Sequence, residues 1–226
     1  MFAALILAAL TLAPDVRMTV VGDSLALGVG ASDSSRGFAF DVFRRVRAER
    51  PKSEVTNLAI GGATAADVVR LEVPRIAATR PSVVLVEAGA NDAVRRHSAA
   101  EFARSYRALV AGIERAAPHA VIVLFNVPDV SVCPIFEGAA KAPLRRLALA
   151  YNLGIANEGR HVRAPIVDLF AFSARAAKDT ARYFSADLFH PSDEGHTAIA
   201  NAAWSTLRPL LLGRSPRSSQ LRPFDR

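Results

Sequence analysis

The stretch RMTVVGDSL, residues 17–25, joins a run of apolar and β-branched residues to a short polar turn. Because β-branched residues favour strands, residues 17–22 predict a strand that ends at Gly22-Asp23-Ser24-Leu25. A helix that starts after such a strand presents free backbone N–H groups and the positive end of its dipole. Ser24 is therefore a candidate nucleophile. The turn is not the G-x-S-x-G elbow of the α/β-hydrolases, because Ala26 stands where that motif requires glycine.

Four further apolar runs follow along the chain. Continuous apolar runs of this length are typical of strands that are buried on both faces of a sheet. The predicted strands after the first are residues 55–59, 83–88, 120–126 and 165–169.

Helical patterns separate these strands. Ser98 and Glu101 have the spacing of a capping box that opens a helix. Residues 144–157 repeat apolar residues at helical spacing, and Ser192 can cap a last helix. Alternating strands and helices predict an α/β protein of three layers, with a five-stranded parallel sheet between two layers of helices. Ligands of such sheets bind beyond the carboxyl ends of the strands.

Glycine and amide residues follow two more of the predicted strands. Gly61 and Gly62 follow the second strand, where they can let the backbone approach a ligand closely or form a tight turn with positive φ. Asn91 follows the third strand, and its amide can donate to a charge that develops in a transition state. An Asn-Asp pair can equally close a turn or cap a helix.

The last block is Asp187-Leu188-Phe189-His190. A carboxylate three residues before a histidine can fold back in one turn and accept the imidazole N–H. The other ring nitrogen would then be free to take a proton from Ser24. Taken alone, an Asp-x-x-His sequence is equally compatible with a surface turn.

These four blocks, in this order, resemble those of the GDSL family, whose members are also called SGNH hydrolases. The resemblance runs from about Thr19 to Ala200 and implies a flavodoxin-like α/β/α fold with a catalytic triad and an oxyanion hole. The implied roles are Ser24 as nucleophile, His190 as base, Asp187 as the acid that orients His190, and Ser24, Gly62 and Asn91 as oxyanion donors.

The second block contains two candidates for its oxyanion donor, Gly61 and Gly62. We prefer Gly62 because it lies two residues before Thr64, as in the usual pattern of the family. The resemblance implies hydrolysis of carboxylic esters through an acyl-enzyme, with a small-molecule ester as the partner and with no cofactor or metal. Since 226 residues leave little room for a lid, we expect an exposed cleft and short to medium acyl chains.

Three other functions remain open on the sequence. An acyltransferase would pass the same acyl group to an alcohol or a sugar instead of water. A carbohydrate O-deacetylase would remove acetyl groups from a polysaccharide. A non-catalytic, flavodoxin-like module could bind an anion at the strand ends, although a binding module has no need of a base oriented by an acid.

Cysteine and histidine content limits the other chemistries. Cys133 is the only cysteine, which excludes an intramolecular disulfide and a zinc site built from cysteines. It lies in residues 127–138, a loop expected over the cleft, where apolar side chains could receive an acyl chain or pack against helices. We expect structural roles for the histidines other than His190, which are His97, His119, His161 and His196.

The net charge of +7 does not indicate a nucleic-acid-binding face. Residues 207–226 hold five arginines and one aspartate, so +4 of the charge lies in this segment and +3 in the rest of the chain. We expect residues 213–226 to form a basic, disordered tail. No nucleic-acid-binding motif accompanies this tail, so we expect no specific nucleic-acid partner.

Residues 1–15 are expected to form an apolar lead-in to a single domain that spans residues 16–212. Residues 2–13 are uncharged and, at twelve residues, far short of the roughly 20 needed to span a membrane. They are compatible with the apolar part of a signal peptide, which favours export to the periplasm or the medium over a cytoplasmic location. The alternatives are a lead-in that packs on the domain and a translation start at Met18.

Overall fold

A computed structural model describes residues 15–213 and contains a five-stranded sheet with the strand order β2-β1-β3-β4-β5. All neighbouring strands of this sheet are parallel. The predicted α/β architecture is therefore confirmed. The strands are β1 (Arg17–Val21), β2 (Glu54–Asn57), β3 (Val83–Val86), β4 (Val121–Phe125) and β5 (Ile166–Val167).

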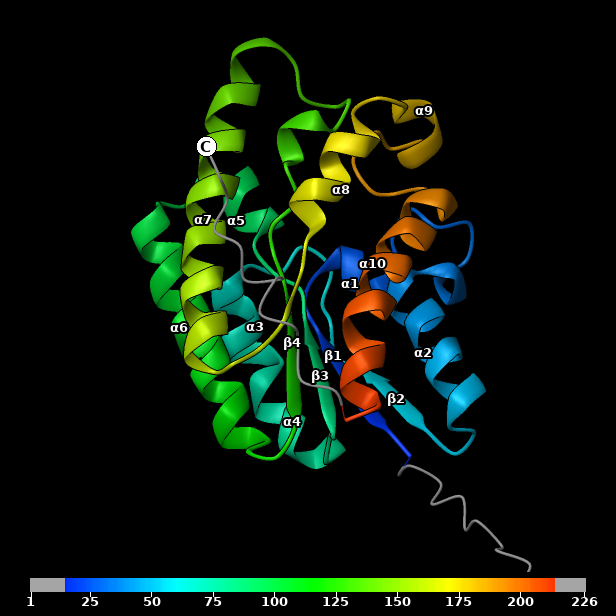
Figure 1. The fold of residues 1–226 in the computed structure, drawn as a ribbon. Coiled ribbons are helices and arrows are strands. Elements are labelled where there is room, and N and C mark those ends of the chain that lie inside the picture. Colours follow the sequence, from blue (N-terminus) through cyan, green and yellow to red (C-terminus); the bar gives the residue numbers. More distant parts are fainter. Residues whose placement is uncertain (1–14, 214–226) are drawn as a thin grey trace, which may run out of the picture.

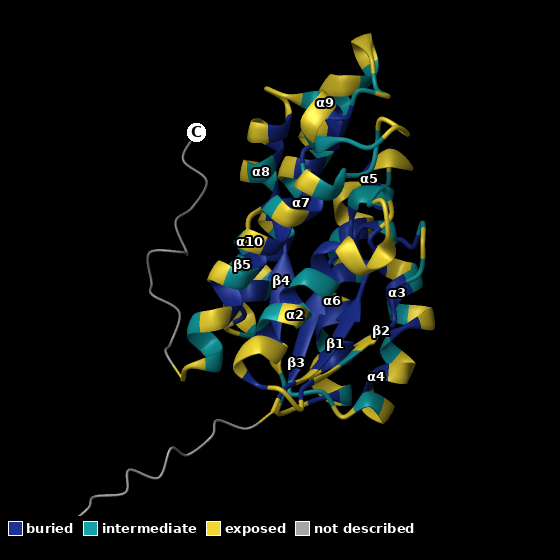
Figure 2. Cartoon of the chain, turned by 90° about the vertical axis from the view of Figure 1, so that its right-hand side faces the viewer, coloured by how far each residue is buried: buried dark blue, intermediate teal, exposed yellow. Residues whose placement is uncertain are grey.

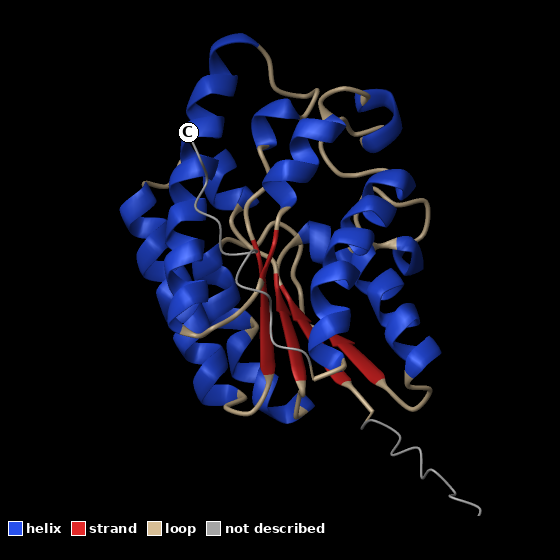
Figure 3. Ribbon diagram, viewed as in Figure 1, coloured by secondary structure: helices blue, strands red, loops and turns tan. Residues whose placement is uncertain are grey.

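Helices cover both faces of the sheet (Figures 1 and 3). The α-helices are α1 (Ser24–Leu27), α2 (Phe38–Glu49), α3 (Ala65–Leu71), α4 (Val73–Thr79), α5 (Ala90–Val94), α6 (Ala99–Ala116), α7 (Lys141–His161), α8 (Leu169–Ala176), α9 (Thr180–Tyr183) and α10 (Asp193–Leu211). Short 3-10 helices are η1 (Ser34–Arg36), η2 (Val130–Val132) and η3 (Gly138–Ala140).

The core consists of two apolar clusters, one on each face of the sheet. Successive residues of β3 alternate between them: Val83 and Leu85 pack in the cluster under α2 and α10, whereas Val84 and Val86 pack under α3, α4, α6 and α7. This alternation follows from the geometry of a strand, in which neighbouring side chains point to opposite faces. The three central strands, β1, β3 and β4, are accordingly among the most buried parts of the molecule (Figure 2).

Two predicted strands differ from expectation. β2 forms one edge of the sheet, and its residues alternate between exposed and half-buried, so the prediction that it is buried on both faces is wrong. β5 forms the other edge and spans two residues, fewer than the predicted residues 165–169. The reason is the order of the strands, because an apolar run does not reveal whether its strand has neighbours on both sides.

The predicted helix starts are confirmed. Ser98 Oγ accepts a hydrogen bond from Glu101 N at 3.2 Å, and Glu101 Oε2 accepts one from Ser98 N at 2.8 Å, which completes the capping box of α6. Ser192 Oγ accepts from Gly195 N at 3.2 Å and caps α10. α7 extends beyond the predicted residues 144–157 at both ends.

The strand order reverses between β1 and β3, because β2 lies on one side of β1 and the later strands lie on the other. In this topology a crevice forms at the carboxyl ends of the strands, at the point of reversal. Ser24 follows β1 and Asn91 follows β3. The fold therefore places two predicted site residues on either side of this crevice.

The predicted lead-in, residues 1–15, and the predicted basic tail, residues 213–226, lie outside the described residues except for Asp15 and Gly213. Within residues 15–213, none of the helices combines the length and the apolar character that crossing a membrane requires.

Candidate active site

Ser24, His190 and Asp187 form a chain of hydrogen bonds, although 166 positions separate Ser24 from His190. Ser24 Oγ lies 2.9 Å from His190 Nε2, and His190 Nδ1 lies 2.6 Å from Asp187 Oδ2. With Asp187 ionised, the neutral imidazole carries its proton on Nδ1 and directs the lone pair of Nε2 toward Ser24. The arrangement can therefore move a proton from Ser24 Oγ to His190.

Asp187 is held by the loop that precedes α10. Its Oδ1 atom accepts hydrogen bonds from Ser185 Oγ at 2.8 Å and from the backbone N–H groups of Phe189 and His190, both at 2.9 Å. Leu188 has a φ of 62°, a left-handed conformation that turns the chain between the acid and the base. Partial burial raises the pKa of Asp187, but the hydrogen bonds outweigh it and hold the pKa well below its usual range. Asp187 is therefore ionised at neutral pH.

Ser24 is the first residue of α1, and Asp23 caps this short helix. Asp23 Oδ1 accepts from Leu25 N, and Asp23 Oδ2 accepts from Asn91 Nδ2, both at 2.9 Å. The buried carboxyl of Asp23 thus connects the turn that contains Ser24 to the start of α5.

Two more carboxyl groups lie buried beneath this turn, those of Glu72 and Glu87, which are 0% and 2% exposed. Glu72 Oε2 accepts from Gly22 N at 2.8 Å, and Glu87 Oε2 lies 3.5 Å from Asp23 N. Burial raises the pKa of Glu72 to about 8, and burial together with the charge of Asp23 raises the pKa of Glu87 well above its usual range. Burial also raises the pKa of Asp23, against the hydrogen bonds that it accepts. Glu87 therefore holds a proton at neutral pH and donates it in a hydrogen bond to Asp23.

Gly61 and Gly62 form a tight turn after β2. Ala63 N donates to Ile60 O at 3.1 Å, and Gly62 has a φ of 76°, which is typical of the third residue of a type II turn and favours glycine. None of the hydrogen bonds found within residues 15–213 uses the backbone N–H of Ser24, Gly61 or Gly62. These N–H groups are therefore available to a ligand at the mouth of the crevice.

Asn91 lies in the first turn of α5 and has partners for both hydrogens of its amide. Its Nδ2 atom donates to Asp23 Oδ2 at 2.9 Å and to Ala63 O at 3.1 Å. Charged oxygens are stronger acceptors than neutral carbonyls. A negatively charged oxygen in the crevice can therefore replace Ala63 O as an acceptor of the Asn91 amide. The other hydrogen of the amide stays bonded to Asp23.

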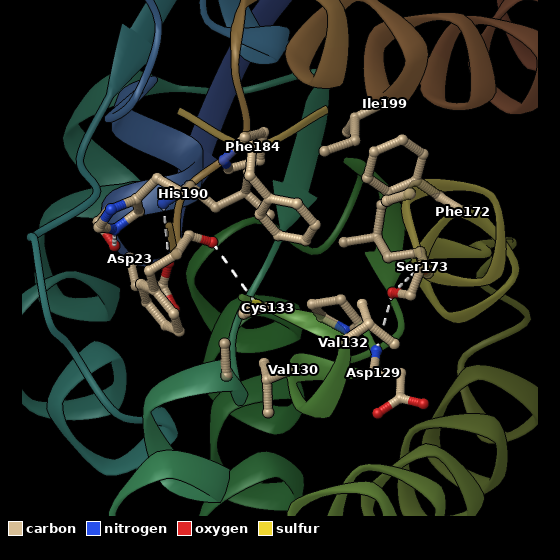
Figure 4. A pocket seen from close by; sticks show the side chains of 18 of the residues that line it. Asp23, Asp129, Val130, Val132, Cys133, Phe172, Ser173, Phe184, His190 and Ile199 are labelled. Carbon is tan, nitrogen blue, oxygen red and sulfur yellow. Dashed lines mark hydrogen bonds between the residues drawn. The ribbon is translucent and has the colours of Figure 1, made fainter. Parts of the chain in front are cut away.

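An apolar pocket of about 60 Å³ adjoins Ser24 and His190. Figure 4 shows His190 and Asp23 at one end of this pocket and Phe172 and Ile199 at the other. The loop of residues 127–138, which was expected over the cleft, lines the pocket and also contributes to the core. Its lining residues are Pro128, Asp129, Val130, Val132 and Cys133.

Residues 20–198 match the GDSL-like lipase/acylhydrolase family, and this span includes every predicted site residue. The chain belongs to this family. The match confirms the resemblance drawn from the four sequence blocks and supports an ester hydrolase over a binding module.

A GDSL-like esterase of Mycobacterium tuberculosis (strain ATCC 25618 / H37Rv) is 27% identical over 214 residues, which cover 87% of this chain and 63% of that protein. The chain therefore spans less than two thirds of the length of this relative. The esterase EstA from Pseudoalteromonas sp. has a similar fold, with a TM-score of 0.68 and 19% identity over 86% of this chain and 98% of that one. A two-domain esterase active on acetylated mannans has a TM-score of 0.68 and 18% identity over 92% of this chain and 53% of its own.

The histidine that follows the site, His196, is fully buried and has two backbone partners. Its Nδ1 atom accepts from Phe38 N at 3.3 Å, and its Nε2 atom lies 3.0 Å from Val29 O, to which it can donate. Burial lowers the pKa of His196, which favours this neutral form. His97 Nδ1 lies 3.2 Å from Asp92 Oδ1. Neither ring lines the pocket beside Ser24.

The remaining candidates lie apart from the hydrogen-bond chain. His119 and His161 are exposed, one just before β4 and the other at the end of α7. The Sγ atom of Cys133 lies 3.7 Å from Phe189 O, and burial, with the nearby charge of Asp129, raises the pKa of the thiol to about 12. Cys133 therefore lines the pocket as an uncharged thiol.

The sequence analysis does not identify four residues that contact the site, which are Glu72, Glu87, Gly30 and Arg95. Glu87 is the one with a visible signal, because it is a charged residue inside the otherwise apolar residues 83–88. Gly30 has a φ of 94°, and a Cβ atom at this position would lie 2.7 Å from His190 Cβ. Arg95 donates to Gly62 O at 2.9 Å. No local pattern predicts the contacts of Gly30 and Arg95, because their partners are distant in sequence.

Proposed function

We propose that the protein is a serine ester hydrolase in which Ser24, His190 and Asp187 form the catalytic triad. The observation that carries the proposal is the continuous path of hydrogen bonds from Ser24 Oγ through His190 to Asp187, at 2.9 Å and 2.6 Å. A binder has no use for such a path, whereas a hydroxyl nucleophile needs a base that is held in one tautomer.

In the first half of the reaction, Ser24 Oγ attacks the ester carbonyl while its proton passes to His190 Nε2. The resulting imidazolium is stabilised by ionised Asp187 and gives its proton to the leaving alcohol, which leaves an acyl-enzyme. In the second half, water gives a proton to His190 and attacks the acyl group, and Ser24 regains its proton when the acid leaves.

The negative oxygen of the tetrahedral intermediate is held, in this proposal, by the backbone N–H groups of Ser24 and Gly62 and by the amide of Asn91. The N–H groups of both glycines are free, and the left-handed conformation of Gly62 is what favours it over Gly61. Asn91 donates to the oxyanion in place of Ala63 O. We expect Asn91→Ala to fold and to lose about 10²–10³ in kcat, the range found when one oxyanion donor is removed.

The size of the apolar pocket supports short acyl chains. Its volume of about 60 Å³ is less than half of the roughly 150 Å³ of an engineered apolar cavity that binds benzene. One water-sized group occupies about 30 Å³ in a liquid, so the pocket accommodates about two such groups, which favours short acyl chains. Phe172 and Ile199 close its far end against longer chains.

Hydrolysis of p-nitrophenyl acetate, butyrate and octanoate tests both parts of the proposal. We expect the highest kcat/KM on acetate or butyrate and loss of activity in Ser24→Ala, with Ser205→Ala as the matched control on α10. Activity retained by Ser24→Ala would overturn the triad. A maximum on octanoate would overturn the chain-length assignment alone.

The same pocket favours carbohydrate O-deacetylation as a second candidate, because an acetyl group fits it and a sugar hydroxyl can leave toward solvent. Release of acetate from an acetylated mannan, compared with that from p-nitrophenyl acetate, tests it. Product analysis with and without an added alcohol acceptor separates hydrolysis from acyl transfer.

A further inference from the structure

Arg95 connects the end of α5 to the turn that carries Gly62. It lies directly after the last residue of α5, and its Nη2 atom donates to Gly62 O at 2.9 Å. Its Nη1 atom lies 3.8 Å from Asp67 Oδ2, on the first turn of α3. The guanidinium is 52% exposed, so it approaches the turn from the solvent side.

The same short segment makes two further bonds to this loop. Asn91 Nδ2 donates to Ala63 O at 3.1 Å, and Asp92 Oδ2 accepts from Ala65 N at 2.9 Å. Asn91 and Arg95 are four residues apart and therefore project from the same side of α5. Residues 91–95 thus hold Gly62, Ala63 and Ala65 from one side.

Arg95 is the contact that restrains Gly62. The space where a Cβ of Gly62 would lie has one neighbour within 4 Å, the Nη2 atom of Arg95, at 3.9 Å. Gly61 is exposed and has one comparable neighbour, Leu27 Cδ1, at 3.7 Å. Two glycines in succession give the backbone its greatest freedom, so this turn depends on outside contacts for a fixed conformation.

The hydrogen bond from Arg95 completes the anchoring of one peptide plane. The plane between Gly62 and Ala63 contains both Gly62 O, which accepts from Arg95, and Ala63 N, which donates to Ile60 O at 3.1 Å. The Gly62 N–H lies in the preceding peptide plane, which is joined to this anchored plane through the φ and ψ rotations of Gly62.

We propose that Arg95 is a positioning residue for catalysis, which acts by fixing the Gly62 N–H in the direction of the oxyanion. The inference rests on the proposed role of Gly62 in ester hydrolysis. Donors stabilise a transition state most when they are fixed before the charge develops. Loss of the Arg95 contact therefore weakens the transition state and leaves the binding of the neutral ester largely unchanged.

The test compares Arg95→Ala with Arg70→Ala. Arg70 pairs with the same Asp67, at 2.9 Å, and is likewise exposed, but it makes no bond to Gly62 O. We expect kcat on p-nitrophenyl acetate to fall about tenfold in Arg95→Ala with little change in KM, because displaced catalytic groups cost roughly this much or more. Arg95→Lys should recover part of kcat, and Arg70→Ala should keep it.

A second readout does not require turnover. Hydrogen exchange of the amides of residues 61–63, followed by NMR, should be faster in Arg95→Ala than in the wild type and unchanged in Arg70→Ala. Faster exchange without any ester hydrolysis in the wild type would overturn the proposed function and leave the restraint of Gly62 intact. Unchanged exchange, or equal losses of kcat in both variants, would overturn the role of Arg95.

Discussion

Two sets of carboxyl groups lie on either side of Ser24, and they differ in exposure and in the direction of their pKa shifts. On the solvent side, Asp187 is 45% exposed at its side chain and has a lowered pKa. On the core side, Asp23, Glu72 and Glu87 are almost completely buried and have raised pKa values. The same functional group is therefore favoured in its charged form on one side of Ser24, whereas burial favours its protonated form on the other.

The difference follows from what surrounds each carboxyl. Asp187 receives hydrogen bonds from its own loop and from His190, which favour the ionised form. Glu72 and Glu87 lack water, and nearby Asp23 makes a further negative charge unfavourable. The exposed acid is suited to stabilise a charge that appears on His190, whereas the buried acids are suited to hold the backbone of the turn.

The largest loss of kcat is expected from a change to the exposed carboxyl, that of Asp187. Asp187→Asn should lower kcat by about 10³–10⁴, because an amide does not fix the reactive tautomer of His190 or stabilise its charged form. Thermal stability should fall somewhat as well, because an amide oxygen accepts the hydrogen bonds of the loop less strongly than a carboxylate does. Asp179→Asn, which alters a carboxylate that caps α9, is the control. A loss of less than tenfold in Asp187→Asn would assign the acid's role to another residue.

A smaller effect on rate, together with a loss of stability, is expected on the buried side. Asp23→Ala removes the cap of α1 and one partner of Asn91. We expect kcat to fall by about 10²-fold, as for loss of one oxyanion donor, and the free energy of unfolding to fall by about 1–2 kcal/mol.

A double-mutant cycle with Asn91→Ala checks whether Asp23 acts through Asn91. If it does, the combined loss of kcat in the double variant should be clearly smaller than the product of the two single losses. Fully multiplicative losses would mean that Asp23 affects the rate by a different path, through the turn of Ser24 alone.

The sequence predicts the exposed pair of Asp187 and His190 better than the buried carboxyl groups. Asp187 and His190 are three residues apart, so a single turn brings them together, and the strand before Ser24 is visible in its β-branched residues. The helix that begins after Ser98 is equally visible, because its capping box is local. In each case the interaction that decides the structure lies within a few residues.

The buried side depends on contacts between distant segments. Glu72 lies 50 residues from Gly22, whose N–H it accepts, and Asp23 lies 68 residues from Asn91. The edge positions of β2 and β5 and the size of the pocket depend on the order of the strands and on the packing of several loops. No sequence pattern within one segment determines these contacts, the order of the strands or the size of the pocket.

The expected effect that is least concerned with the rate is on the pH dependence of stability, and it comes from Glu72. The pKa of this carboxyl rises from 4.5 to about 8 on folding, so between these values the folded protein keeps a proton that the unfolded chain releases. Stability must then fall as the pH rises through this interval, by at most about 1.4 kcal/mol per pH unit. Glu72→Gln removes the titrating group while its side-chain oxygen can still accept from Gly22 N.

Urea unfolding of the wild type and of Glu72→Gln at pH 6, 7, 8, 9 and 10 measures this contribution. We expect the variant to gain stability relative to the wild type with each step in pH, and the gain to level off above pH 8. The comparison, rather than either curve alone, isolates Glu72, because the other titrating groups are common to both proteins. A constant difference across this range would mean that Glu72 is already ionised in the folded state, and that burial beneath the nucleophile does not keep its proton in place.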